Sequence, residues 1–358
     1  MKHPKSLHNV TVLVLMFFCS LMPASMAAKA ESENIDVKEI VLGHLSDAYE
    51  WHILTWNGQH VSIPLPVIVR AQDGAWHMFS SERLTHGGVY EGFYLDKENN
   101  GKIYEKLADG SKARPWDLSL TKDVVQIWIV ALIMLFVFLS CSRWYHRRKS
   151  YDDAPGGFVG LIEMFVMSIY DDVIKPGVGV QRSRIYGPFL LTAFFFIFIT
   201  NLVGLIPIFP GGANVTGNIS ITFILAFCVM LVINLFGNKE YWKETFWPDV
   251  PTWLKVPVPL MPIIEVFGVF IKPFALMVRL FANMMGGHAT ILALTCVIFI
   301  TCQVGIAIGA SLSIVSFLLM LFMNALEFLV AFIQAYVFTM LSSVFIGMAH
   351  PEAHSHGE

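Results

Sequence analysis

The sequence predicts an all-α polytopic membrane protein with five membrane-crossing helices, an interfacial amphipathic helix and a small β-rich N-terminal extramembrane region. The composition and the charge distribution lead to this fold class. Of 358 residues, 55% are hydrophobic and only 14% are charged, and the mean hydropathy is +0.61. Soluble chains carry about 25% charged residues. The net charge of −3 leaves no basic surplus for binding nucleic-acid phosphates, so no nucleic-acid partner is expected.

The charged residues are distributed very unevenly along the chain. Residues 1–123 hold 27 of the 51, whereas residues 124–142 and 186–238 hold none. Between Pro273 and Pro351, only Arg279 and Glu327 are charged. Because a helix needs roughly 20 apolar residues to cross ~30 Å of hydrocarbon, these charge-poor stretches predict membrane spans.

The first 28 residues have the pattern of a secretory signal peptide. Lys2 and Lys5 precede an apolar run, Val10 to Met22, and small residues follow it up to Ala28. The alternative is a first membrane helix, for which the run is short. Residues 29–122 would then form a periplasmic or other extracytoplasmic region.

This exported region shows short β-like runs separated by turn signals. The runs are His60–Val69, Ala75–Ser80, Gly88–Leu95 and Lys102–Lys106. The region contains no cysteine after the signal peptide, so no disulfide framework is expected there. It also shows no pattern of catalytic residues.

The first predicted span, Val124–Ser142, fixes the orientation of the chain. It is followed by four cations between positions 143 and 149, which mark the cytoplasmic side of a membrane. Phe158–Ile174 then has apolar residues at helical spacing and predicts an interfacial helix that ends near Pro176, Gly177 and Gly179.

Four further spans are expected. The second and third are Phe189–Ile206 and Ile219–Phe236. The last two, Pro273–Ile300 and Leu312–Gly347, would be ~42 and ~54 Å long as helices. Because neither fits upright in a ~30 Å core, both are expected to be long and tilted. Five crossings place the N-terminal region outside and the C-terminus in the cytoplasm.

The last two spans contain three ionisable residues at membrane depth: Arg279, His288 and Glu327. Such residues are costly in a bilayer and face protein or water rather than lipid. A structural polar pair between helices is the alternative for any one of them. Three together, with the amides of Asn283 and Gln334 nearby in the sequence, favour a functional role.

A hairpin register places these residues in two levels. A break near position 307, between Gly305 and Gly309, pairs positions that add to about 614, so His288 lies opposite Glu327 and Arg279 lies opposite Gln334. The imidazole and the carboxylate are suited to proton exchange near neutral pH. Arginine cannot release a proton. It would instead lower the pKa of a carboxylate, and that carboxylate is expected in another subunit.

Several ordered motifs resemble subunit a of the F-type ATP synthase. Leu276-Met-Val-Arg279-Leu-Phe-Ala-Asn283-Met284 is similar to its arginine helix, and Asn201-Leu-Val-Gly-Leu-Ile-Pro207 is similar to an earlier span. Glu265 with Lys272-Pro273, and Glu327 seven residues before Gln334, fit its later helices. The resemblance covers about residues 120–349, so residues 123–349 are expected to form the family's membrane domain, followed by a His-rich tail at 350–358.

The resemblance implies a stator subunit of the membrane sector, with two half-channels and a rotating ring of c subunits as partner. Arg279 would face the ring carboxylate, with Asn283 and Gln334 beside it. His288 and Glu327 would line the outer half-channel, and Glu265 the inner one. Many family members have Glu at the position of His288 and His at that of Glu327, so this pair is exchanged.

The resemblance also implies the surroundings of the protein. Its other partners would be the b subunits of the stator stalk, the catalytic head and the lipid bilayer, in a bacterial inner membrane. Both H⁺ and Na⁺ stay open as the coupling ion, because the ion-binding carboxylate lies in the ring subunit.

The sequence gives no sign of catalysis or of a cofactor. It has no phosphate-binding loop of the G-x-x-x-x-G-K-[ST] type, so nucleotide chemistry is expected in partner subunits. The alternative function is a proton-coupled secondary transporter, but the internal repeats typical of that class are not evident. His350, His354 and His356 have metal-ligand spacing, although a solvated tail is favoured and no metal is expected.

Overall fold

The computed structural model describes residues 46–56, 59–96, 101–107, 111–148, 155–206, 211–246, 260–304 and 306–350. The chain is mostly helical and divides into two compact units. Unit 1 combines residues 1–130, 200–215 and 285–328, and unit 2 combines residues 131–199, 216–284 and 329–358. The expected signal peptide and the tail beyond His350 lie outside the described residues.

Four described helices are long and apolar enough to cross a membrane. They are α3 (Lys122–His146), α6 (Ser183–Gly204), α7 (Ile219–Phe236) and the Ile314–Met348 part of α10. These correspond to four of the five expected spans. The remaining one, 273–300, is helical throughout but is not among the four.

Two of the expected span boundaries are wrong because prolines do not end these helices. The span expected from Phe189 begins at Ser183, with Pro188 inside α6. The span expected from Pro273 belongs to α9 (Leu260–Val304), which runs through that proline. In the interior of a membrane helix, neighbouring groups can satisfy the carbonyl that proline leaves free.

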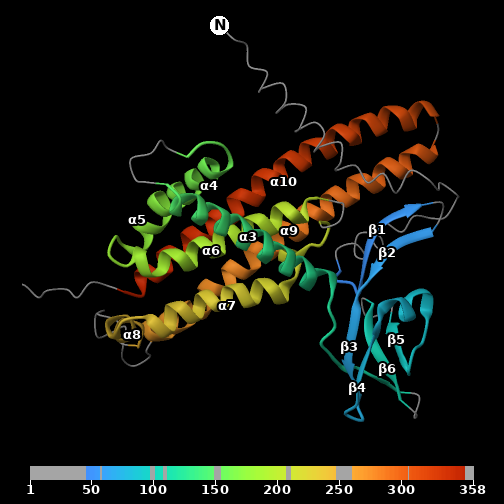
Figure 1. Cartoon of the computed structure of the whole chain (residues 1–358), viewed down its shortest axis with the longest axis horizontal. Helices are drawn as coiled ribbons and strands as arrows, with labels where there is room; N and C mark the ends of the chain where they lie inside the picture. The colour runs from blue at the N-terminus through green and yellow to red at the C-terminus, as the bar shows by residue number, and fades with distance from the viewer. Residues whose placement is uncertain are drawn as a thin grey trace, which may run out of the picture. The chain divides into compact units, whose positions relative to one another are not determined.

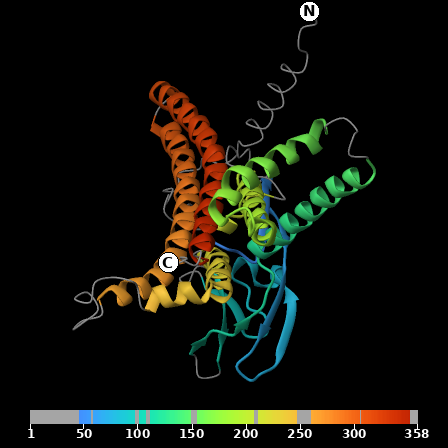
Figure 2. The ribbon, with the colours of Figure 1, turned by 90° about the vertical axis from the view of Figure 1, so that its left-hand side faces the viewer.

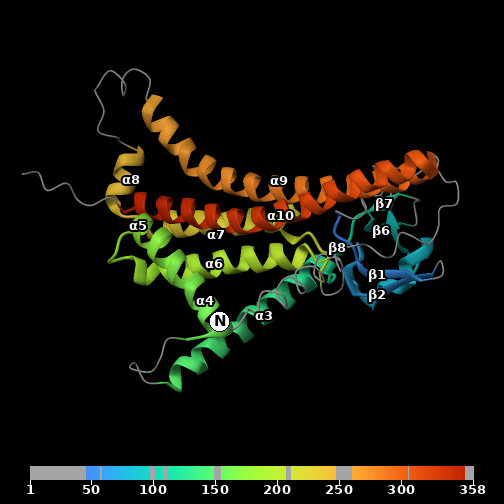
Figure 3. The same ribbon diagram turned by 90° about the horizontal axis from the view of Figure 1, so that it is seen from above.

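Helices α9 and α10 (Ile306–Met348) contain 45 and 43 residues and lie side by side, as Figures 2 and 3 show. Helix α9 ends at Val304 and α10 begins at Ile306, close to the break expected near position 307. Both helices are longer than the expected 28 and 36 residues.

The N-terminal part of unit 1 consists of short antiparallel strands, most of which are labelled in Figure 1. One sheet pairs β1 (Glu50–Trp56) with β2 (Gln59–Pro64). A second has the order β4-β3-β8, and a third has the order β5-β6-β7. The remaining strands are β3 (Pro66–Arg70), β4 (Trp76–Ser80), β5 (Phe93–Asp96), β6 (Lys102–Lys106), β7 (Lys112–Ala113) and β8 (Trp116–Asp117). Buried side chains of β3 to β6, such as Val67, Val69, Phe79, Phe93 and Ile103, form the core.

The structure corrects three expectations about these strands. β1 was not expected. The run His60–Val69 is two strands, because Pro64 and Pro66 flank the point where pairing changes partner. In the run Gly88–Leu95, pairing begins only at Phe93, because Glu91 and Gly92 have positive φ values of 52° and 86° and turn the chain.

The helix expected over Phe158–Ile174 is present and is longer than expected. It consists of α4 (Gly157–Ser168), a π-helical segment (Ile169–Ile174) and α5 (Lys175–Val178). Pro176 lies inside this helical run, which ends at Gly179, where φ is +92°. No residue of α4 is buried, whereas Ile169, Val173 and Ile174 join the core of unit 2. The expected apolar face is therefore fully buried only in its second half, although Phe165 and Val166 of α4 pack against the same core.

Aromatic and aliphatic side chains from α6, α7, α9 and α10 form most of the rest of the unit 2 core. α6 contributes Phe194 and Ile197, α7 contributes Val229, and α10 contributes Phe338. From α9, Leu276 and Leu280 are buried, whereas Val278 lies on the opposite, exposed face and Arg279 is exposed at the side. This burial pattern fixes which face of α9 points away from the core.

Candidate functional site

In unit 1, α9 and α10 bring His288 and Glu327 together. The Nε2 atom of His288 lies 3.8 Å from Oε1 of Glu327, and their side chains are 17% and 4% exposed. Thr295 Oγ1 donates to Met320 Sδ over 3.5 Å. The residue numbers of this pair and of the His288–Glu327 pair both add to 615, so the two pairs belong to one antiparallel register. The expected pairing of His288 with Glu327 is therefore confirmed by the geometry.

A distance of 3.8 Å is too long for a direct hydrogen bond. His288 Nε2 and both carboxylate oxygens of Glu327 are buried and have no hydrogen-bond partner among the described residues. Buried polar atoms in native proteins are normally hydrogen-bonded, to protein or to water. The arrangement suits two groups that exchange protons through water rather than a closed structural pair.

A glycine on α9 makes this close approach possible. A Cβ atom at Gly287 would lie 2.6 Å from Oε1 and 3.0 Å from Cδ of Glu327. Gly286, one residue earlier, has no atom within 4 Å of its Cβ position. The Glu327 carboxylate therefore lies directly against the α9 backbone at Gly287.

In unit 2, the same two helices bring Asn283 and Gln334 together. Asn283 Nδ2 donates a hydrogen bond to Gln334 Oε1 over 2.6 Å, and Gln334 is 2% exposed. Gln334 was expected opposite Arg279, but no contact between those two side chains is recorded in the described part of unit 2. The bond instead joins Gln334 to the residue one turn after Arg279.

Arg279 itself is exposed on α9 and forms no ion pair with the described residues. The exposed residues next to it on the helix surface are Ala275, Val278 and Ala282, with the amide of Asn283 one turn later. An unpaired guanidinium on an apolar helix surface is costly in a membrane unless another group covers it. Its place is that expected for a cation that pairs with a group outside this chain.

The last expected site residue, Glu265, lies near the beginning of α9 and is half-buried. Its carboxylate is close to Tyr241 of α8 (Lys239–Phe246), also in unit 2. Burial raises the pKa of Tyr241, and the charge of Glu265 adds to that rise. The Tyr241 hydroxyl also donates to Asn234 Oδ1 over 3.5 Å.

Sequence reasoning missed several buried polar residues near these sites. In unit 1 these include Gln126 of α3 and Thr200 of α6, and in unit 2 they include Thr339 and Ser342 of α10. Their side-chain oxygens or nitrogens include atoms that lack a partner among the described residues. Gln126 could have been singled out from the sequence, because it is the one side-chain amide in the apolar, uncharged stretch 124–142. Serine and threonine are too common in apolar helices for their positions in the sequence to indicate such a site.

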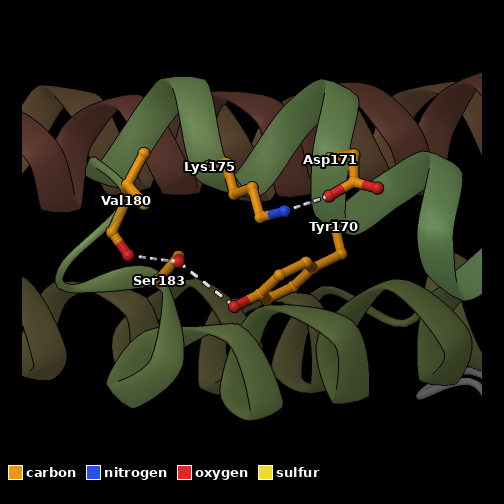
Figure 4. Close-up of polar contacts among 5 residues, drawn as sticks. All are labelled: Tyr170, Asp171, Lys175, Val180 and Ser183. Atoms are coloured by element: carbon orange, nitrogen blue, oxygen red, sulfur yellow. Dashed lines mark hydrogen bonds and ion pairs between the residues drawn. The ribbon is translucent and has the colours of Figure 1, made fainter.

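The π-helical segment is held at its polar face by local contacts in unit 2 (Figure 4). Tyr170 and Ser183 share a hydrogen bond between their hydroxyls of 3.1 Å, and Ser183 Oγ donates to the carbonyl of Val180 over 2.8 Å. Lys175 pairs with Asp171, and this hydrogen bond raises the pKa of Lys175. These contacts fix the turn that leads from the 157–178 helical run into α6.

Among the described residues, no group of three or more His, Cys, Asp or Glu side chains is arranged to hold a metal ion. His350, the first histidine of the tail, contacts the Ile346 carbonyl through Nδ1 over 2.9 Å and the Tyr186 hydroxyl through Nε2 over 3.0 Å. His354 and His356 lie outside the described residues.

These features define a polytopic helical membrane protein with ionisable side chains along two long helices. Residues 124–347 match the family model described as ATP synthase A chain, and the chain belongs to that family. Residues 40–118 match a second model, described as a domain of unknown function (DUF8433). The β-rich part of unit 1 thus corresponds to a family of its own.

Curated relatives agree with the family. The ATP synthase subunit a of Chloroherpeton thalassium is 41% identical over 280 residues, which cover 75% of this chain and 78% of the relative. ATP synthase subunit a 2 of Chlorobaculum tepidum is 40% identical over 250 residues, covering 67% and 66% of the two chains. The subunit a of Myxococcus xanthus is 37% identical over 247 residues, covering 68% and 76%.

Proposed function

We propose that the chain is the proton-translocating, non-catalytic stator subunit of an ATP synthase membrane sector. Membership of the family supports a role in proton transport for ATP synthesis. The observation that carries the finer proposal is the exposed, unpaired guanidinium of Arg279 on an apolar face of α9. A carboxylate on the rotating c-subunit ring is the partner that would neutralise it.

In this mechanism, protons enter from the outer side through His288 and Glu327, whose buried polar atoms are free to bind water. They load a ring carboxylate, which then moves through lipid in its neutral form. When that carboxylate reaches Arg279, the fixed cation lowers its pKa and favours proton release. The proton leaves toward the cytoplasm by a path near Glu265.

Arg279 also separates the two half-channels, because guanidinium cannot release its proton at ordinary pH. The hydrogen bond from Asn283 to Gln334 ties α9 to α10 one turn away from Arg279. This tie limits the movement of the helix surface that carries the guanidinium. We therefore assign Asn283 and Gln334 a positioning role.

The proposed organisation is a signal peptide at 1–28, an extracytoplasmic region at 29–122, a membrane domain at 123–349 and a cytoplasmic tail at 350–358. Five crossings, with α4 lying on the cytoplasmic face and α9 and α10 tilted, agree with this order. The membrane is a bacterial inner membrane. Besides the c ring, the partners are the b subunits of the stator stalk and the catalytic head.

The proposal is tested with Arg279→Ala in inverted membrane vesicles. We expect ATP-driven proton pumping to be abolished while the chain still co-purifies with the small ring subunit and the ATPase head. Lys272→Gln, on the same helix, is the matched control, since the Lys272 ammonium lies 5.8 Å from the ring centre of Phe345 within unit 2. Normal pumping by Arg279→Ala would overturn the assignment.

A further inference from the structure

The outer site contains a buried amide that the proposed mechanism does not use. Gln126 of α3 is fully buried in unit 1, and its Oε1 accepts a hydrogen bond of 3.0 Å from the backbone N–H of Ala213. Because an N–H needs an acceptor, this contact fixes which end of the amide is oxygen. The Nε2 end is left without a partner among the described residues.

This amide nitrogen and the imidazole of His288 border the same space beside Gly204. A Cβ atom built on Gly204 of α6 would lie 4.0 Å from Gln126 Nε2 and 3.9 Å from His288 Nε2. It would also lie 3.2 Å from the Ala213 carbonyl oxygen. The absence of a side chain at Gly204 therefore leaves a space bordered by two unpaired nitrogens and one carbonyl oxygen.

We propose that Gln126, Gly204, Ala213 and His288 form a water site on the outer proton path, in which Gln126 is a positioning residue. A water molecule there has the two to four polar partners that a buried water requires. The Gln126 amide donates to its oxygen, and the water donates to the Ala213 carbonyl or to neutral His288. The inference rests on the proposed function, since it places this water next to the imidazole–carboxylate pair.

The amide does not carry a proton itself. A proton arriving on the water passes to His288 Nε2, and the water is left neutral, so no bond other than the transferred O–H is broken. Glu327 Oε1, 3.8 Å from the same imidazole nitrogen, then faces the protonated ring. The role of Gln126 is to hold the water oxygen where its hydrogens reach His288.

The β-rich region takes part in building this site. Trp51 is 4% exposed, and its Nε1 donates to the carbonyl of Gly211 over 3.1 Å, two residues before Ala213. The backbone N–H of Lys122, at the start of α3, donates to the carbonyl of Ala48 over 3.0 Å. Gly211 is thus fixed to β1, and the beginning of α3 is fixed to the segment just before β1.

The test measures passive proton flux through head-stripped inverted vesicles, with the lumen set at pH 6 or pH 8. Gln126→Leu is expected to reduce the flux about tenfold at both pH values, because the loss of one hydrogen bond is worth about a factor of ten. Gly204→Ala, whose methyl group fills the space, is expected to act in the same direction. Ser140→Leu, an exposed polar-to-leucine change on α3, is the control.

Gln126→Glu separates a positioning role from a purely structural one. The carboxyl group keeps the acceptor for Ala213, but it donates to the water only when it is protonated. We expect a flux within twofold of the unchanged chain at lumen pH 6 and a drop of about tenfold at pH 8. This variant keeps the shape of glutamine, so it also covers the case in which the leucine variant does not fold.

Unchanged flux in Gln126→Leu, or a Gln126→Glu flux with no extra pH dependence, would overturn the water site. Arg279→Ala in the same vesicles reports on the proposed function separately. If Arg279→Ala abolishes pumping while the Gln126 variants behave like the unchanged chain, only the water site fails. If Arg279→Ala pumps normally, the stator assignment fails as well.

Discussion

Asn283 donates a hydrogen bond of 2.6 Å to the side-chain oxygen of Gln334 and thereby joins α9 to α10 in unit 2. Gln334 is almost completely buried, so this bond satisfies a polar group that water does not reach. Such bonds between membrane helices contribute about 1 kcal/mol. Substitutions that remove this bond therefore test the packing of the two long helices.

We expect Asn283→Leu and Gln334→Leu to be coupled energetically. Each single change leaves a buried or partly buried amide unpaired, whereas the double change removes both. A double-mutant cycle on the free energy of unfolding in detergent should give a coupling of about 1 kcal/mol. Asn324→Leu is the control, because the Asn324 amide donates to the Met320 carbonyl within its own helix. Additive effects of the first pair would contradict the prediction.

We expect the exchange His288→Glu/Glu327→His to transport protons better than either His288→Ala or Glu327→Ala. The two side chains face each other, so the exchange keeps one acid and one imidazole at the same place. Removing one proton-exchanging group should lower ATP-driven pumping about a hundredfold. Fluorescence quenching in inverted vesicles measures the rates. An exchange variant as inactive as the alanine variants would show that the groups do not act as a pair.

We expect Gly287→Ala and Gly286→Ala to shift the thermal stability of the purified chain in opposite directions. A methyl group at Gly287 would collide with the Glu327 carboxylate, and the strain should cost about 1 to 3 kcal/mol. At Gly286 the Cβ position is open, and alanine is favoured over glycine in a helix by about 1 kcal/mol. Thermal unfolding in detergent measures both. Equal shifts would mean that the carboxylate does not rest against Gly287.

We expect the β-rich region to lose stability above pH 10 because of Tyr49. Burial, followed by the hydrogen bond to Asp117, raises the pKa of Tyr49 above its usual value near 10. Below pH 10 the phenol is protonated in both the folded and the unfolded chain. Above it, only the unfolded chain releases the proton, so stability falls as pH rises.

The check is urea unfolding of the full chain, followed by tryptophan fluorescence between pH 8 and pH 11. Tyr49→Phe should be less stable at pH 8, by about 1 kcal/mol, but should lose less stability on going to pH 11. Tyr104→Phe, a half-buried tyrosine on β6, is the control. An alkaline loss of the same size in Tyr49→Phe and the unchanged chain would rule out this role of Tyr49.

The helices and one polar pair could be predicted from the sequence because both depend on local patterns. The bounds of α7 are those expected for the third span, Ile219–Phe236, and the hairpin expected near position 307 predicts the register that joins His288 to Glu327. Pro188 and Pro273 misled the boundary assignment, because helical hydrogen bonding on either side overrides a local breaker. The predicted partner of Gln334, Arg279, lies one turn before the observed partner, Asn283. The register sets the level at which residues of the two helices meet, but it does not determine the side-chain rotamers.

The β-rich region and the buried amide were harder to predict for a different reason. Gln126 matters because the chain folds segment 211–213 and α6 around it, and no spacing in the sequence reveals such a contact. The turn at Glu91 depends on a positive φ at a residue other than glycine, which composition does not indicate. Long-range packing decides both.

The exposed guanidinium of Arg279 affects the membrane insertion and the degradation of the newly synthesised chain. Insertion of an arginine at the centre of a membrane helix costs about 2.5 to 3.5 kcal/mol, which corresponds to a population factor of about a hundred. A copy that has not met the proposed ring partner would carry that cost alone. We expect unassembled copies to be inserted poorly and degraded, so that this residue acts as a checkpoint that couples the amount of the subunit to the supply of rings.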